Sequence, residues 1–181
     1  MAAVLDAITE AAVGASGAAN GWLVQAVDNE LRVVAAAGGR PGDALGLTVP
    51  ADRGTTGFVV ASGQPVAAVP NPDDDRFSVT VAQALDIRPT SVLSVPCATD
   101  DGVLGALEVI DKQEGGRFTI DDVEIVTLLG GIAGAALVDA SGAAATVTPP
   151  EELAGELRQL AAGDPARYAS VAGVVRALLG G

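Results

Sequence analysis

Two pairs of apolar segments constrain the fold of this chain more than any other feature of its sequence. Residues 91–98 and 103–110 have the length and apolar character of strands, and the Asp-Asp-Gly sequence at 100–102 is typical of a tight turn. Residues 22–27 and 31–37 repeat this pattern across another short connection. Because hairpins join consecutive strands, the sequence predicts a sheet that is mainly antiparallel.

Helices are predicted at both ends of this strand-rich region. Residues 1–19 carry apolar side chains at helical spacing, and Asn20-Gly21 is expected to end this helix because glycine tolerates a left-handed C-cap. Thr119 begins a second helix, with Asp122 in the capping-box position, and the apolar pattern continues to about residue 140. Both helices are expected to cover one face of the sheet.

Shorter elements complete the predicted domain. Residues 45–49 are expected to form a third strand and residues 58–62 a short helix. Residues 65–69 fit an edge strand, because proline cannot donate to a central ladder. Ser78 is placed to cap a short helix over residues 78–86. The whole pattern predicts an α+β fold of about six strands, with the N- and C-terminal helices packed on one face.

The chain is expected to divide into three parts. Residues 1–140 form the α+β domain, and the small, turn-prone residues 141–148 predict a linker. Residues 149–181 predict a helical hairpin, since helix-start signals occur at Thr148 and again at Asp164. Two short helices cannot bury both of their apolar stripes alone, so this hairpin is expected to dock on another surface.

The charge balance excludes several classes of partner. The chain has 23 acidic and 10 basic residues and a net charge of −13, so its surface should repel nucleic-acid phosphates and anionic lipids. The nearly uncharged run at 125–138 is shorter than the roughly 20 residues that span a bilayer. Cys97 is the single cysteine, and the N-terminus lacks a signal-peptide pattern. The chain is therefore expected to be cytoplasmic, bound neither to nucleic acid nor to a membrane.

The residue inventory argues against catalysis. The chain has no histidine, which removes the usual general base and the commonest metal ligand. Phosphate-binding, dinucleotide-binding and serine-hydrolase motifs are absent. Asn71, Asp73 and Asp75 imitate the start of a calcium loop, but Arg76 stands where that loop needs glycine. We therefore expect no enzyme activity, no metal and no cofactor.

Five segments, in this order and spacing, resemble the GAF domain family. They are 53–66, 75–77, 91–97, 102–112 and 118–124. The resemblance covers about residues 1–140 and implies the same α+β fold, with a ligand pocket over the sheet. Candidate lining residues implied by the resemblance are Thr56, Arg76, Phe77, Asp86, Ser91 and Ser94.

Arg76 and Phe77 have two interpretations. They could offer a guanidinium fork and a stacking face to a ligand. Alternatively, Arg76 balances the negative charge of the neighbouring aspartates, and Phe77 packs in the core. Glu108 is a charge inside a predicted strand, expected to be paired or to face solvent, and it is assigned no role.

A second group of residues corresponds to a signature of GAF domains in cyclic-nucleotide phosphodiesterases, Asn-Lys…Phe-x-x-x-Asp-Glu. Lys112, Phe118 and Asp122 match it, whereas Asp111 and Val123 depart from it. The resemblance implies that Lys112 and Asp122 form a structural latch between the strand end and the last helix. The two departures argue against a cyclic nucleotide as the ligand.

The last helix of the domain is apolar nearly all round, so part of it should be covered by something other than the sheet. Gly130, Gly131 and Gly134 would permit close approach of a second backbone. The resemblance implies a homodimer through the first and last helices; alternatively, residues 149–181 fold back over this surface.

The expected function is that of a non-catalytic regulatory or adaptor protein that binds a protein partner, a small molecule or both. Residues 149–181 would serve as its docking element. The alternative is a sensor of a nucleotide or small metabolite that acts through helix-bundle rearrangement.

Overall fold

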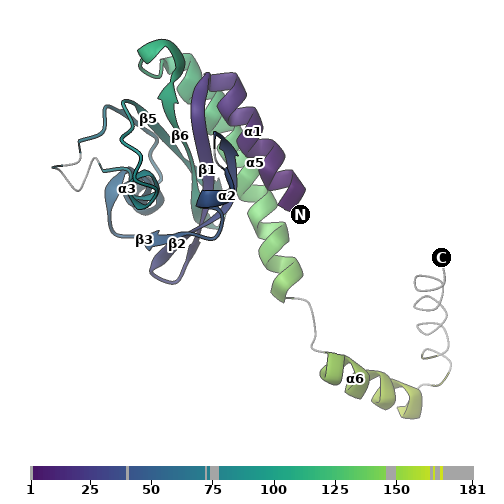
Figure 1. Ribbon diagram of the computed structural model, residues 1–181. Helices are drawn as coiled ribbons and strands as arrows, with labels where there is room; N and C mark the ends of the chain where they lie inside the picture. Colours follow the sequence, from purple (N-terminus) through teal and green to yellow (C-terminus); the bar gives the residue numbers. More distant parts are fainter. Residues whose placement is uncertain are drawn as a thin grey trace. The chain divides into compact units, whose positions relative to one another are not determined.

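A six-stranded sheet organises the N-terminal part of the chain (Figure 1). The structure is a computed structural model and describes residues 2–39, 41–71, 73, 78–145, 150–163, 165 and 168. Its contacts divide the chain into two units, Met1–Ala140 and Ser141–Gly181, and each is described by itself.

The strands follow the spatial order β3-β2-β1-β6-β5-β4, and every neighbouring pair is antiparallel. The expected α+β class and the number of strands are confirmed. β4 lies at the edge, as its preceding proline predicts. The strands are β1 Ala18–Val27, β2 Glu30–Gly38, β3 Thr48–Pro50, β4 Val66–Ala68, β5 Val92–Thr99 and β6 Gly102–Lys112.

Helices cover both faces of the sheet. α1 (Ala2–Ser16) and α5 (Ile120–Ala145) pack on one face, as predicted, and share an apolar cluster with β1, β5 and β6 (Figure 1). The other face carries a second apolar cluster beneath α2 (Pro41–Ala44), α3 (Gly54–Ser62) and α4 (Thr80–Ala84). A short 3-10 helix, η2 (Gln113–Gly115), follows β6.

The first helix ends earlier than the sequence predicts. α1 stops at Ser16, and Gly17, with a φ of 64°, makes the left-handed turn into β1. Gly21 lies inside β1 instead. A Cβ atom on Gly21 would come within 2.7 Å of Cγ2 of Val13, so its role is to let α1 lie close to the sheet.

The last helix of the domain is longer than predicted and uses its glycines differently. α5 continues through residues 141–145 of the expected linker, because alanine, the strongest helix former, dominates there. A Cβ on Gly130 or Gly134 would lie 2.7 Å from the Pro96 carbonyl oxygen or 2.6 Å from that of Ala98. These two glycines therefore admit the backbone of β5, in the same chain, rather than that of a second molecule.

The second unit contains α6 (Pro150–Gly163), which is the first helix of the expected hairpin. Most of the second helix, expected from Asp164, and residues 146–149 fall outside the described residues.

Candidate functional site

Among the described residues, two cavities lie on the side of the domain that carries α2 and α4. The first, of about 300 Å³, lies over the start of β1 and the end of β2 and is walled by α2 and by the chain that follows α4. The indole of Trp22 and the side chains of Leu85 and Ile87 give it apolar walls, and Asn20 and Asp43 add polar groups. Its volume is at the lower end of the range typical of small-molecule sites.

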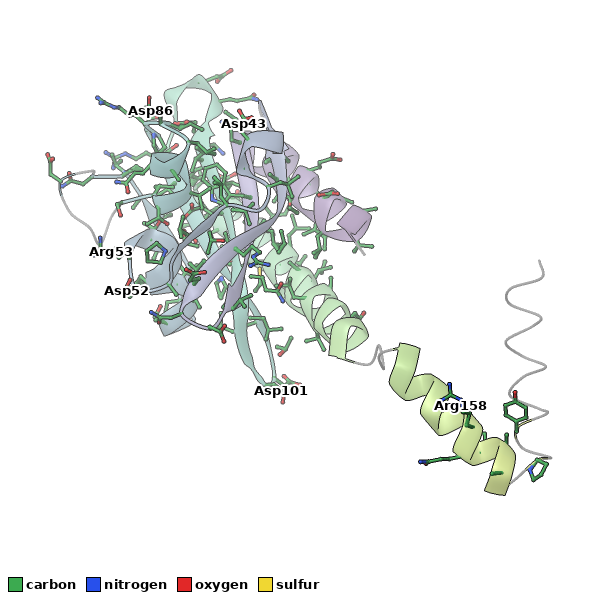
Figure 2. All side chains as sticks on the ribbon, turned by 60° about the horizontal axis from the view of Figure 1, so that its bottom comes forward. Asp43, Asp52, Arg53, Asp86, Asp101 and Arg158 are labelled. Atoms are coloured by element: carbon green, nitrogen blue, oxygen red, sulfur yellow. The ribbon has the colours of Figure 1, made fainter. Side chains whose placement is uncertain are left out.

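The second cavity, of about 420 Å³, is lined by α4 and by the segments before and after it, and it shares Ile87 with the first. Its lining combines charged and polar side chains with apolar ones: Asp73, Gln83, Asp86 and Arg88 together with Pro70, Val79, Ile87 and Pro89. Figure 2 labels Asp43, beside the first cavity, and Asp86, beside the second. Asp86 takes a left-handed backbone conformation, with a φ of 56°.

A buried polar cluster lies under α3, centred on Glu108 of β6. The carboxyl group is completely buried. The Trp22 indole nitrogen donates to its Oε1 at 2.8 Å, and the Thr55 and Thr56 hydroxyls lie 2.9 and 2.7 Å from its Oε2. Ser94 stands opposite Glu108 on β5; its buried hydroxyl makes no hydrogen bond of good geometry within the described residues but is close enough to lower the pKa of Glu108. We call these five residues the Glu108 cluster.

Burial is the main effect on the Glu108 carboxyl group and raises its pKa, because an apolar environment disfavours the charged form. The hydroxyl of Thr56 and the indole of Trp22 lower that pKa by less. The sequence does carry a signal for this cluster. Glu108 is two residues away from both Ala106 and Ile110, and because successive side chains of a strand point to opposite faces, all three lie on the same buried face.

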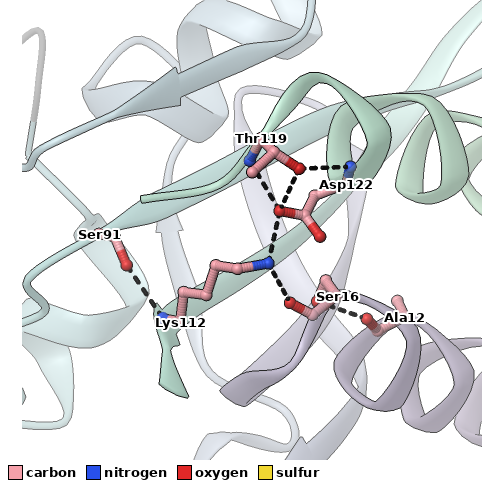
Figure 3. Close-up of polar contacts among 6 residues, drawn as sticks. All are labelled: Ala12, Ser16, Ser91, Lys112, Thr119 and Asp122. Atoms are coloured by element: carbon pink, nitrogen blue, oxygen red, sulfur yellow. Dashed lines mark hydrogen bonds and ion pairs between the residues drawn. The ribbon is translucent and has the colours of Figure 1, made fainter. Parts of the chain in front are cut away.

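Lys112 and Asp122 come together at one end of the sheet (Figure 3), and the ring of Phe118 lies beside Lys112. Nζ of Lys112 lies 2.5 Å from Oδ2 of Asp122, 3.0 Å from the carbonyl oxygen of Ser16, and 5.7 Å from the ring centre of Phe118. Thr119 donates to the same Oδ2 through its N–H and its hydroxyl. One lysine thus joins the end of β6 to the end of α1 and the start of α5.

Two opposing effects act on the pKa of Asp122. Burial raises it, but the hydrogen bonds from Lys112 and Thr119 outweigh burial and hold the pKa below its usual value. The Asp122 N–H donates in turn to the Thr119 hydroxyl at 3.3 Å, completing the reciprocal capping arrangement.

The six residues proposed to line a pocket have different environments. Thr56 and Ser94 belong to the Glu108 cluster. The Ser91 hydroxyl accepts from the N–H of Lys112 at 3.0 Å, so it fastens the neighbouring strand. Asp86 borders the second cavity. Arg76 and Phe77 fall outside the described residues.

Cys97 is buried on β5, and burial raises the pKa of its thiol to about 12. It is thus a small core residue without thiolate character at neutral pH.

No group of three metal-ligating side chains occurs within the described residues. None of the helices described is both long enough and apolar enough to cross a bilayer.

The sequence profile of the GAF domain matches residues 1–138. The chain belongs to the GAF domain family. GAF domains are generally regulatory and non-catalytic, and this match agrees with the sheet order and the flanking helices described above. No curated protein sequence matches this chain.

Solved structures share the GAF fold. The second GAF domain of DevS from Mycobacterium smegmatis is 20% identical, with a TM-score of 0.60 over 78% of this chain and 96% of that one. The GAF domain of an Acinetobacter phosphoenolpyruvate-protein phosphotransferase is 18% identical, with a TM-score of 0.63 over 78% and 85%. A type II free methionine-R-sulfoxide reductase from Thermoplasma acidophilum is 11% identical, with a TM-score of 0.58 over 76% and 95%.

Proposed function

We propose that this GAF-domain protein is a non-catalytic regulatory protein that acts by association, through the outer face of α1 and α5. The observation that carries the proposal is an exposed apolar row on α5, which we call the α5 stripe: Ile125, Leu128, Ile132 and Ala135. The first three side chains are 41%, 66% and 49% exposed. Their spacing of three and four residues is typical of a seam between helices.

The outer face of α1 complements this stripe. Ala7, Ala11 and Gly14 are exposed there and present little side-chain volume. In a two-fold symmetric pair, the large residues of the α5 stripe from one copy can lie against the small residues of α1 from the other. A second copy of this chain is therefore the occupant we propose, with residues 149–181 of the same chain as the alternative.

The test is the oligomeric state of the full chain by sedimentation. Leu128→Glu should convert a dimer into a monomer, because a buried carboxylate would have no counter-charge in the seam. Thr127→Glu is the matched control, since Thr127 is exposed on the same helix but outside the stripe. A monomeric wild-type chain, or equal effects of the two variants, would contradict the proposal.

The alternative occupant makes a different prediction. If residues 149–181 cover the α5 stripe, a chain that ends at residue 148 should expose it and associate more strongly than the full chain. If a second copy covers it, the shortened chain stays a dimer. Loss of a complex with another protein on this truncation would instead support the docking role proposed for residues 149–181.

The first cavity supports a second candidate function, that of a small-molecule sensor. Its described lining contains Asp43 and no basic residue, so it suits a small neutral or amine-bearing metabolite better than a nucleotide phosphate. A thermal-shift screen of amino acids, keto acids and nucleotides tests this candidate. A ligand at about 100 times its Kd stabilises the fold by roughly 2.7 kcal/mol. If none of these compounds raises the unfolding temperature, association remains the one proposed function.

The case against catalysis rests on the chemistry of the described side chains. The Cys97 thiol is buried and protonated, and Glu108 is sealed under α3 without access to a substrate. A lone cysteine also has no partner within the chain to resolve a sulfenic acid.

A further inference from the structure

The Glu108 cluster holds a carboxyl group in the core without a counter-charge among the described residues. β1 contributes the indole of Trp22, α3 contributes the hydroxyls of Thr55 and Thr56, and β5 contributes Ser94. All four groups are neutral. Arg53, the basic residue beside α3, is exposed and directed away from the core. Hence only neutral dipoles face the carboxyl group from the described parts of these elements.

Neutral donors do not replace a cation for a buried carboxylate. An ionised group removed from water loses hydration that short hydrogen bonds restore only in part. The first turn of α3 adds a favourable helix dipole, but this effect is modest. Burial, which raises the pKa of Glu108, therefore outweighs the hydrogen bonds that lower it.

The hydrogen-bond geometry also accommodates the protonated acid. The Thr55 hydroxyl lies 2.9 Å from Oε2 of Glu108 and 3.4 Å from the carbonyl oxygen of Ser78. A hydroxyl can accept one hydrogen bond while it donates another. Protonated Glu108 can therefore donate to Thr55, which then donates to Ser78, while Trp22 and Thr56 still donate to the carboxyl group. No donor is lost when the proton binds.

We propose that Glu108 is a proton-binding site, held in its uncharged form near neutral pH, which joins the sheet to α3. Through Thr55 and Ser78 the site extends to the segment that precedes α4, and Trp22 extends it to the wall of the first cavity. Loss of the proton places an uncompensated charge under α3 and loosens that helix. The protonation state thereby couples pH to both cavities, independently of dimer formation.

The experiment compares the unfolding equilibrium of the wild-type chain with that of Glu108→Gln as a function of pH. Trp22, the one tryptophan of the chain, is buried and its fluorescence reports unfolding. Glutamine preserves the size of the neutral acid but does not titrate. In the unfolded chain Glu108 ionises above about pH 4.3. If the folded chain retains the proton, the wild-type unfolding constant rises about tenfold per pH unit relative to Glu108→Gln.

Glu30→Gln is the control, since Glu30 is an exposed glutamate on β2. The ratio of the Glu30→Gln unfolding constant to the wild-type unfolding constant should stay the same over this pH range. A Glu108→Gln ratio that is independent of pH between about pH 5 and about pH 8 would mean that the folded chain ionises as the unfolded one does, and would overturn the proposal. If the wild-type unfolding constant instead falls with rising pH relative to Glu108→Gln, the fold stabilises the carboxylate of Glu108, and the proposal is equally overturned.

Discussion

The indole nitrogen of Trp22 donates a hydrogen bond of 2.8 Å to the carboxyl group of Glu108, which stands opposite it on β6. The two residues are 86 positions apart in the sequence. Trp22 also forms part of the wall of the first cavity. A change at either residue therefore acts both on the core beneath α3 and on the cavity.

Replacing Trp22 by phenylalanine should destabilise the fold by about 1–3 kcal/mol, because the buried carboxyl group loses a donor. Chemical denaturation followed by circular dichroism measures the change. In a double-mutant cycle with Glu108→Leu, which removes the acceptor that glutamine would keep, the two substitutions should couple, since each removes one partner of the same contact. Strict additivity would show that the hydrogen bond contributes nothing to stability.

Neutralising the aspartate of the Lys112–Asp122 contact should weaken the link between β6, α1 and α5. Asp122→Asn is expected to lower the free energy of unfolding at neutral pH by about 1.5–3 kcal/mol, the range for hydrogen bonds to charged groups. The control is Asp121→Asn, an exposed neighbour in the same helical turn, with an expected effect of about 0.3–1 kcal/mol from the helix dipole.

The same contact predicts an acid dependence of stability. Because folding lowers the pKa of Asp122, its contribution is present above the pKa of the unfolded chain, about 3.9, and is lost as the pH falls through the lower folded value. Wild type should therefore lose stability relative to Asp122→Asn below about pH 4. A constant difference between the two proteins across this range would contradict the assignment.

Gly134 and Gly131 offer a matched pair on α5. Gly134→Ala places a Cβ 2.6 Å from the carbonyl oxygen of Ala98 and should cost about 1–3 kcal/mol through overpacking. Gly131 is exposed with open space around it, so Gly131→Ala should instead stabilise the helix by up to about 1 kcal/mol. Thermal unfolding of both variants measures the contrast, and equal shifts would refute the packing described for α5.

Cys97 should resist thiol reagents in the folded protein. Its burial and its raised pKa, about 12, remove both access and thiolate. Labelling with an aromatic disulfide should be negligible in native buffer and complete in denaturant. Rapid stoichiometric labelling under native conditions would show that β5 opens readily.

Local patterns in the sequence were sufficient to predict the two hairpins, the capping residues of α5 and the helices at both ends of the domain. The boundaries were less well predicted. Gly17 and Gly21 are equally plausible helix ends by residue type, but α1 packs against β1 at Gly21 and the turn falls at Gly17. The alanines after Ala140 extend α5 where a linker was expected, since small residues favour helix as well as loops.

By itself, the sequence determined the α+β class, the antiparallel pairing and the absence of histidine chemistry, because periodicity, turn residues and composition are local properties of the chain. Only the tertiary structure decided which polar groups meet. The first cavity draws on β1, β2, α2 and the loop after α4, and Glu108 acquires partners from β1 and α3. Such contacts depend on packing between distant segments. Burial then determines whether a carboxyl group is an ionised surface group or, as proposed for Glu108, holds a proton in the core.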